Sequence, residues 1–118
     1  TYTGEVDHSS VLNFLAHADL VVIPSLKEGL GNVAIEALML KRTILAAHTG
    51  GLPEVVIHEE TGFLFRAGDA MSLVEQFSRL LNQSVNIRPE NQKVHFEKYF
   101  TVSAHIKQLR QCFDPFLQ

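Results

Sequence analysis

The residues with the clearest potential for chemistry lie in a loop between an apolar segment and a helix. This loop runs Ser25-Leu26-Lys27-Glu28-Gly29-Leu30-Gly31-Asn32. Gly29 and Gly31 allow the backbone to turn sharply and to approach a ligand without a Cβ in the way. The first N–H groups of the following helix have no intrahelical partner, and the helix dipole favours an anion there, such as a diphosphate. The sequence therefore predicts an anion site at Gly31 and Asn32.

Two carboxylates flank this predicted site. Glu28 lies in the loop, and Glu36 lies one turn into the helix, on the same face as Asn32. A carboxylate beside an anion is favourable when it accepts hydrogen bonds from hydroxyls, and the ribose and hexose of a nucleotide sugar supply such donors. Taken alone, the glycines are also typical of plain turn residues and Glu36 of a solvated helix residue, so both alternatives remain open.

Other residues with chemical potential have simpler interpretations. Thr49-Gly50-Gly51 follows a predicted strand and either lines the same cleft or only turns the chain. Glu54 is interpreted as an acid that favours the start of a short helix, and His48 as a solvent-facing residue. The six histidines show no metal spacing, and the sequence contains no Asp-x-Asp pair. Cys112 is interpreted as a small buried hydrophobe.

Size and charge limit the class of protein. The 118 residues form one domain or part of one, with 46% hydrophobic and 19% charged residues, which is typical of a soluble globular protein. The net charge of −3 argues against a nucleic-acid binder, which needs a basic surplus. A single cysteine excludes an internal disulfide and fits a cytoplasmic protein.

The spacing of apolar residues predicts alternating strands and helices. Strands are predicted at 2–6, 20–23, 43–47 and 63–65, and helices at 11–16, 32–40, 70–81, 88–99 and 102–115. Ser9 or Ser10 is expected to cap the first helix, and Thr101 the last. This alternation predicts a parallel α/β sheet. A doubly wound domain usually has about six strands, so the first units are expected upstream of Thr1.

Two of these helices are expected to bury a broad apolar stripe. In the helix at 70–81, the stripe consists of Leu73, Val74, Phe77, Leu80 and Leu81. In the last helix, the inward-facing residues are expected to be Val102, Ile106, Leu109, Phe113 and Phe116.

The segment Glu28-Gly29-Leu30-Gly31-Asn32-Val33-Ala34-Ile35-Glu36-Ala37 resembles the E-x7-E motif of the group 1 family of retaining glycosyltransferases. The context of the motif resembles that family in the same order along the chain. The matching segments are Ala18-Asp19, Pro24-Ser25, 49–56, 61–64, the helix at 70–81 after Gly68-Asp69, and Phe100-Thr101. The resemblance covers essentially the whole chain.

This resemblance implies a Rossmann-like parallel sheet with helices on both faces, as in the C-terminal domain of a GT-B fold. Residues 1–118 would be the nucleotide-sugar-binding domain, incomplete at its N-terminus, and the N-terminal acceptor domain would lie outside this chain. The implied substrates are a nucleotide-diphosphate sugar and a glycan or lipid-linked acceptor, with no metal or other cofactor. The implied partner is the N-terminal domain of the same protein, which would supply any peripheral contact with the inner face of the membrane.

The resemblance also implies roles for individual residues. Glu28 would approach the hydroxyls of the donor sugar and act in catalysis, and Glu36 would hold the ribose. The backbone of Gly29, Leu30 and Gly31 would face the sugar and the diphosphate. The main chain around Val6 would contact the nucleobase.

Two departures limit what the resemblance implies. Asn32 stands where many members have an apolar residue, and the Arg and Lys that clamp the diphosphate would lie upstream of Thr1. Lys27 does not match that position and is interpreted as a solvated loop residue. The isolated chain is therefore expected to be inactive. The alternatives are a non-catalytic nucleotide-binding or interaction module and a GT-B sugar-nucleotide epimerase. A Rossmann dehydrogenase is disfavoured because no G-x-G-x-x-G motif follows a strand.

Overall fold

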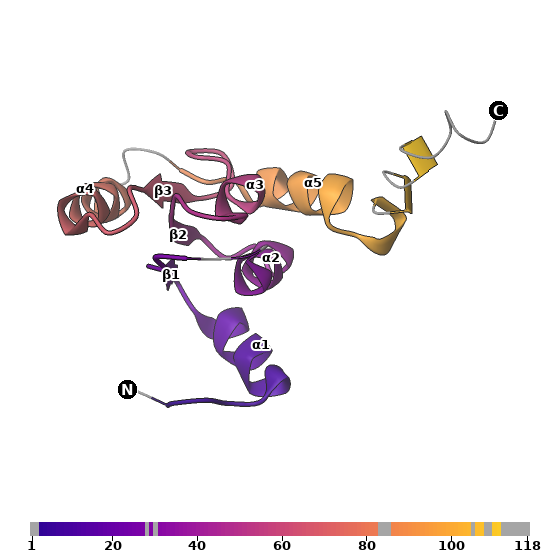
Figure 1. The fold of residues 1–118 in the computed structure, drawn as a ribbon, viewed down its shortest axis with the longest axis horizontal. Coiled ribbons are helices and arrows are strands. Elements are labelled where there is room, and N and C mark those ends of the chain that lie inside the picture. Colours follow the sequence, from indigo (N-terminus) through magenta and orange to yellow (C-terminus); the bar gives the residue numbers. More distant parts are fainter. Residues whose placement is uncertain are drawn as a thin grey trace.

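Three short parallel strands form the sheet of this protein in a computed structural model, which describes residues 3–27, 29, 31–82, 86–104, 106–107 and 110–111. The elements are α1 (His8–His17), β1 (Val21–Ile23), α2 (Asn32–Met39), β2 (Ile44–Ala47), α3 (Leu52–Val55), β3 (Phe63–Phe65), α4 (Ala70–Leu81) and α5 (Pro89–Tyr99). The strand order is β1-β2-β3, with Val22 opposite Leu45 and Ala46 opposite Leu64. Parallel strands joined through helices confirm the predicted α/β class (Figure 1).

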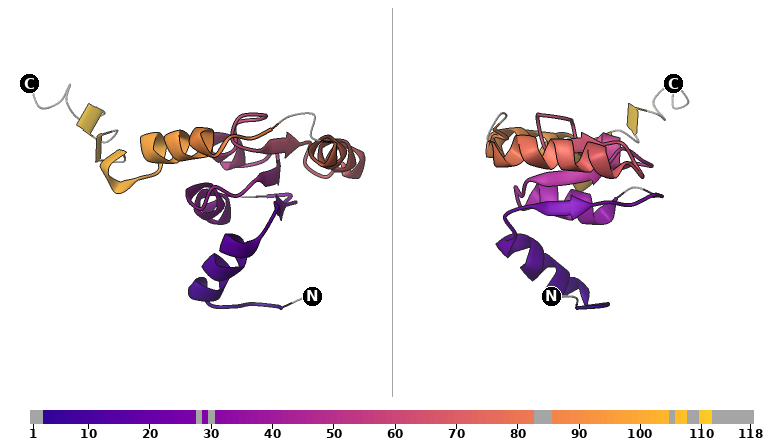
Figure 2. Two further views of the ribbon diagram at one scale, coloured as in Figure 1. Left: turned by 180° about the vertical axis from the view of Figure 1, so that it is seen from behind. Right: turned by 90° about the vertical axis from the view of Figure 1, so that its left-hand side faces the viewer.

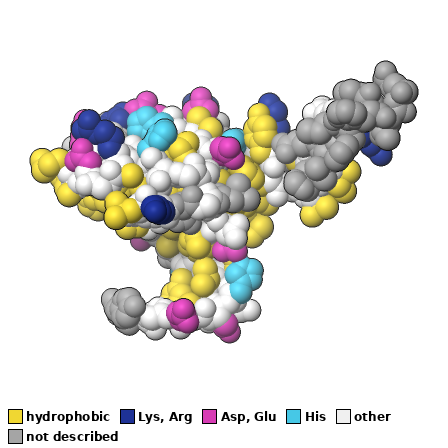
Figure 3. All heavy atoms as spheres, in the orientation of Figure 1, with side chains coloured by type: hydrophobic (Ala, Val, Ile, Leu, Met, Phe, Trp, Pro, Cys, Tyr) yellow, Lys and Arg dark blue, Asp and Glu magenta, His cyan; other side chains and the backbone are white. Residues whose placement is uncertain are grey.

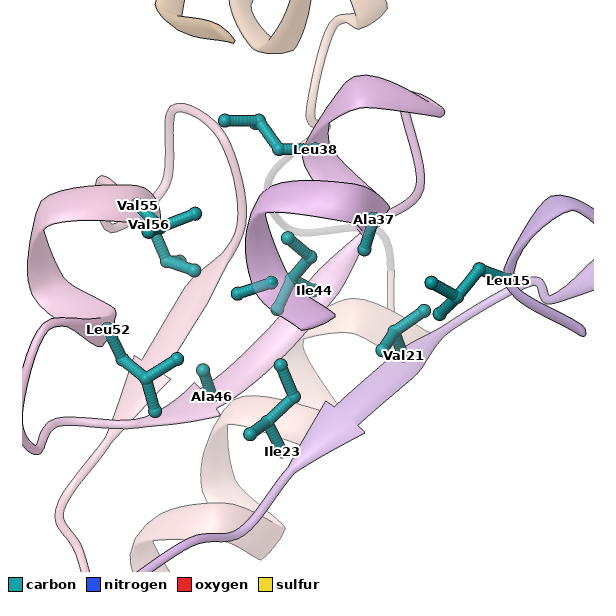
Figure 4. Close-up of a cluster of buried hydrophobic side chains, with 11 residues drawn as sticks. Leu15, Val21, Ile23, Ala37, Leu38, Ile44, Ala46, Leu52, Val55 and Val56 are labelled. Carbon is teal, nitrogen blue, oxygen red and sulfur yellow. The ribbon is translucent and has the colours of Figure 1, made fainter. Parts of the chain in front are cut away.

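Helices cover both faces of this sheet. On one face, Ile44 and Ala46 of β2 pack with α1, α2 and α3 in one buried cluster, which Figure 4 shows in close-up. On the other face, Leu45 and Ala47 pack with Phe63 and Phe65 against α4. All of β2 is fully buried. The views in Figures 1 and 2 show α4 on one side of the strands and the other helices on the opposite side, so the layer order is that of a Rossmann-like domain.

The strand β1 forms one edge of the three-stranded sheet and is only partly covered. The first and last residues of this strand, Val21 and Ile23, are buried, but Val22, which points to the other face, is 43% exposed. Parallel strands are usually covered on both faces, so this part of the sheet presents an open apolar surface. The expectation that further strand–helix units lie upstream of Thr1 stays a prediction.

The start of the chain differs from the sequence-based expectation. Residues 3–6 form no strand, because this segment leads into α1 at the end of the helix away from the sheet, where the described residues offer no strand with which to pair (Figure 1). Asp7 caps α1 in place of Ser9 or Ser10: its carboxylate accepts a hydrogen bond from the backbone N–H of Ser10 at 2.9 Å. Hydrogen bonds from the side chain and backbone of Ser10 hold the pKa of Asp7 below its usual value.

Two predicted apolar stripes are more exposed than expected. In α4, Leu73 and Leu80 pack against the sheet, but Val74, Phe77 and Leu81 are 51%, 38% and 67% exposed. The reason is that α4 lies at the β3 side of a narrow sheet and contacts it along one face only.

The segment after α5 also leaves the core. Thr101 caps it as predicted, since its hydroxyl accepts a hydrogen bond from the N–H of Ala104 at 3.0 Å. Val102 and Ile106 are 77% and 55% exposed, because this stretch leads away from the sheet (Figure 1). Figure 3 shows hydrophobic side chains open at the α4 end and beside this stretch. Leu109, Cys112, Phe113 and Phe116 lie outside the described residues.

The buried side chain of Gln92 connects α5 to the rest of the domain by hydrogen bonds. Its side chain is 1% exposed, and its amide nitrogen donates to the carbonyl oxygens of Arg42 at 2.6 Å and Thr61 at 3.4 Å. We expect Gln92→Leu to destabilise the domain by about 1–3 kcal/mol, because it keeps the volume but leaves buried carbonyls unpaired. Urea denaturation measures this, with Lys93→Leu on the exposed side of α5 as control. Equal midpoints for the two variants would contradict the prediction.

Candidate functional site

The loops that follow β1 and β2 meet at the carboxyl end of the sheet, where open parallel sheets bind ligands. The backbone N–H of Gly51 donates to the carbonyl of Gly29 at 2.6 Å. The hydroxyl of Thr49 donates to the carbonyl of Leu26 at 3.2 Å. The turn at Thr49-Gly50-Gly51 is therefore in direct contact with the loop at 25–31, the glycine loop, and whether the turn also lines a ligand site stays a prediction.

The helix α2 begins at this junction with a glycine rather than a side-chain cap. Gly31 is its N-cap with φ 82° and ψ 57°, a left-handed conformation that glycine adopts without steric cost. Among the described residues, no side chain hydrogen-bonds the cap, and Asn32, the first residue of α2, is exposed, so an anion could reach the first N–H groups of the helix. The helix has eight residues, and its dipole favours a negative charge at this end.

The two glycines of the loop serve different purposes. A Cβ at Gly31 would lie 2.8 Å from Cδ2 of Leu52, a fully buried residue of α3. The backbone at Gly31 therefore needs glycine for its conformation and for close packing of α2 on α3. A Cβ at Gly29 would meet no atom within 4 Å, so Gly29 borders open space. The sequence-based expectation of close approach to a ligand fits Gly29 better than Gly31.

Glu36 is anchored by a residue that the sequence did not single out. Its carboxylate Oε1 lies 2.6 Å from Nε2 of His8, the first residue of α1. The side chain of Glu36 is 21% exposed and that of His8 is 70% exposed, so the pair bridges α1 and α2 at the surface. Glu36 is therefore a partly exposed helix residue with a side-chain partner, and its role toward a ligand stays a prediction. The available signal for His8 was its position two residues after Val6, at the start of a helix.

Of the remaining predicted residues of this region, Val6 and Lys27 are among the described residues, whereas Glu28 and Leu30 are not. Val6 is 39% exposed and lies just before α1, on the chain that leads to His8. Glu28 and Leu30 lie outside the described residues, so the carboxylate predicted to face the sugar keeps only its sequence-based assignment. Lys27 is exposed, as its interpretation as a solvated loop residue requires.

Two other residues weighed from the sequence are accounted for by local structure. His48 is exposed, and its backbone N–H donates to the carbonyl of Phe65 at 2.8 Å, which continues the sheet. Glu54 lies in the first turn of α3 with an exposed side chain, and its carbonyl oxygen bonds His95 at 2.9 Å. Neither observation adds a ligand contact, so both residues keep their structural interpretation.

A wide groove lies elsewhere on the molecule than the glycine loop. It has a volume of about 1270 Å³ and runs between α3 and α5, with Glu54, Val94, His95 and Tyr99 among its walls. None of Gly29, Gly31, Asn32 and Glu36 lines it. The predicted site at the glycine loop and this groove are therefore separate features of the surface. Across residues 3–111, apart from those the structure leaves undescribed, no group of three His, Cys, Asp or Glu side chains is placed to hold a metal.

Comparison with known proteins identifies the family. The model of the family described as glycosyl transferases, group 1, matches residues 1–99 of this chain. The chain belongs to this family. The match includes the glycine loop, α2 and the turn after β2, so the two loops that meet at the sheet are those of a group 1 glycosyl transferase.

Curated relatives carry the names of glycosyltransferases. The capsular polysaccharide biosynthesis glycosyltransferase CapM of Staphylococcus aureus is 27% identical over 113 residues, which cover 93% of this chain and 30% of CapM. The N-acetyl-alpha-D-glucosaminyl L-malate synthase of Bacillus anthracis is 35% identical over 80 residues, 68% of this chain and 20% of that protein. The group 1 chain thus spans less than a third of the length of these relatives.

Solved structures confirm the fold. The sucrose-phosphate synthase of Thermosynechococcus elongatus superposes with a TM-score of 0.80 and 30% identity, over 99% of this chain and 30% of that one. HepE of Anabaena, solved in complex with UDP, superposes with a TM-score of 0.70 and 25% identity, over 86% of this chain and 29% of HepE. The group 1 chain is therefore part of a GT-B domain of Rossmann-like architecture. Within the described residues, no helix is both long and apolar enough to span a bilayer.

Proposed function

We propose that residues 1–118 are the donor-binding, C-terminal part of a retaining glycosyltransferase that takes a sugar from a nucleotide diphosphate. The observation that carries this proposal is the junction of the two loops. There the N-terminus of α2, which has a glycine and no described side chain as its cap, follows the open space at Gly29. Such a helix end suits a diphosphate. Glu36 lies one turn further into the same helix, within reach of a ribose attached to that diphosphate.

The donor would lie along this junction with its nucleoside toward α1. The main chain around Val6 would contact the base, Glu36 would accept hydrogen bonds from the ribose hydroxyls, and the N–H groups at Gly31 and Asn32 would hold the diphosphate. The sugar would extend toward Gly29, Leu30 and Glu28. That HepE was solved in complex with UDP supports a nucleotide as part of the ligand.

In the proposed reaction, an acceptor hydroxyl attacks the anomeric carbon on the face from which the diphosphate departs. The bond between that carbon and the phosphate oxygen breaks through an oxocarbenium-like state, and the departing phosphate takes the proton of the acceptor. The product keeps the anomeric configuration of the donor. The N-terminus of α2 stabilises the charge that develops on the diphosphate, and Glu28 stabilises the positive charge on the sugar.

No divalent metal is required in this proposed reaction, so addition of EDTA should leave the rate of sugar transfer unchanged.

The acceptor is proposed to be a glycan or lipid-linked sugar held by the N-terminal domain of the whole protein, in the cytoplasm or at the inner face of its membrane. The names of CapM and of the teichuronic acid biosynthesis glycosyltransferase TuaC of Bacillus subtilis support a polysaccharide product. The test is incubation of the full-length protein with UDP-, GDP- and ADP-sugars, followed by NMR of the product. A glycoside with retained configuration is expected. An isomerised nucleotide sugar would indicate an epimerase, and binding without turnover a non-catalytic module.

The 118 residues alone are expected to bind the donor weakly and to transfer no sugar, because the basic clamp and the acceptor domain are proposed to lie in the rest of the protein. The same assay with the isolated chain checks this expectation. Formation of a glycoside by these residues would contradict the proposal that transfer needs the rest of the protein.

A further inference from the structure

We infer that His8 is a positioning residue that holds the carboxylate of Glu36 in place for the ribose of the donor. This inference rests on the proposed function of Glu36. The observation that carries it is the 2.6 Å contact between Nε2 of His8 and Oε1 of Glu36, which joins residues 28 positions apart on two helices.

The chemistry of the contact fixes the direction of the hydrogen bond. An ionised carboxylate only accepts hydrogen bonds, so Nε2 of His8 carries the proton that it donates to Oε1. A carboxylate offers about four lone-pair sites. His8 uses one of them, which leaves Oε2 and part of Oε1 for the two hydroxyls of a ribose. The contact therefore orients Glu36 without occupying its capacity to bind a sugar.

Both partners are held by their surroundings. The Asp7 cap fixes the first turn of α1, where His8 lies. Leu15, further along α1, is buried in the same cluster as Ala34 and Ala37 of α2. Because α1 and α2 are packed together, the His8 ring is presented to Glu36 by a rigid support rather than by a loop. A glutamate oriented in advance loses less side-chain freedom when a ligand binds.

The position of His8 indicates which part of the donor it affects. Val6, whose main chain is proposed to contact the nucleobase, lies two residues before His8, whereas the glycine loop directly precedes α2. His8 is therefore expected to influence binding of the nucleoside and not the breaking of the sugar–phosphate bond. Its loss should raise the donor KM and leave kcat almost unchanged.

The test uses calorimetry on the full-length protein. UDP, GDP and ADP are titrated first, and the tightest binder is used with its 2′-deoxy form. His8→Ala is expected to weaken binding by on the order of fivefold, consistent with the cost of immobilising a free side chain, and to reduce the preference for ribose over 2′-deoxyribose. His8→Gln, which keeps an N–H donor, should restore most of the affinity. The control is His17→Ala, which removes another exposed histidine of α1, whose ring nitrogen donates to the carbonyl of Asn13 in its own helix.

A double-mutant comparison separates positioning from a merely structural role. In a Glu36→Gln background, His8→Ala should weaken binding little further, because the carboxylate that His8 holds is gone. Independent, multiplicative losses would overturn the inference, as would equal effects of His8→Ala and His17→Ala. If Glu36→Gln leaves binding unchanged, the ribose role of Glu36 in the proposed function is wrong. If Glu36→Gln weakens binding and His8→Ala does not, only the present inference fails.

Discussion

Replacement of Glu28 by glutamine in the full-length protein is expected to lower kcat by about a hundredfold while the affinity for the donor changes little. The size is that of removing one preorganised electrostatic group from an active site. Glutamine keeps the shape of the side chain but removes a negative charge. The benefit of that charge grows as the sugar becomes cationic in the transition state, so its loss affects turnover more than ground-state binding. Steady-state kinetics with the best donor of the nucleotide-sugar panel measures both quantities.

Glu36→Gln is the matched comparison for this result. Glu36 is proposed to bind the ribose, which does not change during transfer, so its loss should raise the donor KM with a smaller effect on kcat. Glu60→Gln, an exposed acid on the turn before β3, controls for the loss of one negative charge. Equal losses of kcat at Glu28 and Glu36, or unchanged turnover in Glu28→Gln, would mean that the two roles are wrongly assigned.

Gly31→Ala is expected to destabilise the domain by about 2–5 kcal/mol. A left-handed conformation costs an L-residue roughly 1–2 kcal/mol, and Gly31 has φ 82°. The added Cβ would also lie 2.8 Å from Leu52, which is fully buried and cannot swing into solvent. Overpacking of this kind costs about 1–3 kcal/mol. Because α2 would have to shift away from α3, its N-terminus would move as well, and binding of the nucleoside diphosphate should weaken.

The control for this substitution is Gly29→Ala in the same loop. A Cβ there meets nothing within 4 Å, so the stability of the domain should hardly change. Urea denaturation of both variants gives the difference in the free energy of unfolding, and calorimetry gives the affinity for the diphosphate. Similar unfolding midpoints for the two variants would show that neither the left-handed conformation of Gly31 nor its packing on Leu52 requires glycine.

The sequence predicted the central part of this fold well. The apolar segments at 20–23, 43–47 and 63–65 coincide with β1, β2 and β3, because strands covered by helices need unbroken β-branched and apolar residues. The helix at 70–81 has the predicted bounds, with Asp69 as its cap. The start of α2, which is proposed to bind an anion, was also foreseeable, since Gly31 and the following apolar periodicity mark where the helix begins.

What the sequence could not predict depended on tertiary contacts. An apolar stripe such as Val74, Phe77 and Leu81 shows that a helix has a face to bury, but not how wide the partner surface is. The segment before α1 contains strand-forming residues, but a strand forms only beside another strand. The His8–Glu36 contact joins two helices that no local pattern connects. The placement of Glu28 lies outside the described residues, so its role rests on the motif alone.

A structure of the full-length protein with its preferred nucleoside diphosphate bound would locate the donor site directly. We expect the diphosphate at the N–H groups of Gly31 and Asn32, the ribose hydroxyls on Glu36 with His8 still bonded to it, and the base beside the main chain at Val6. A nucleotide bound elsewhere, for example in the groove between α3 and α5, with Glu36 free of contact, would contradict the proposed donor site.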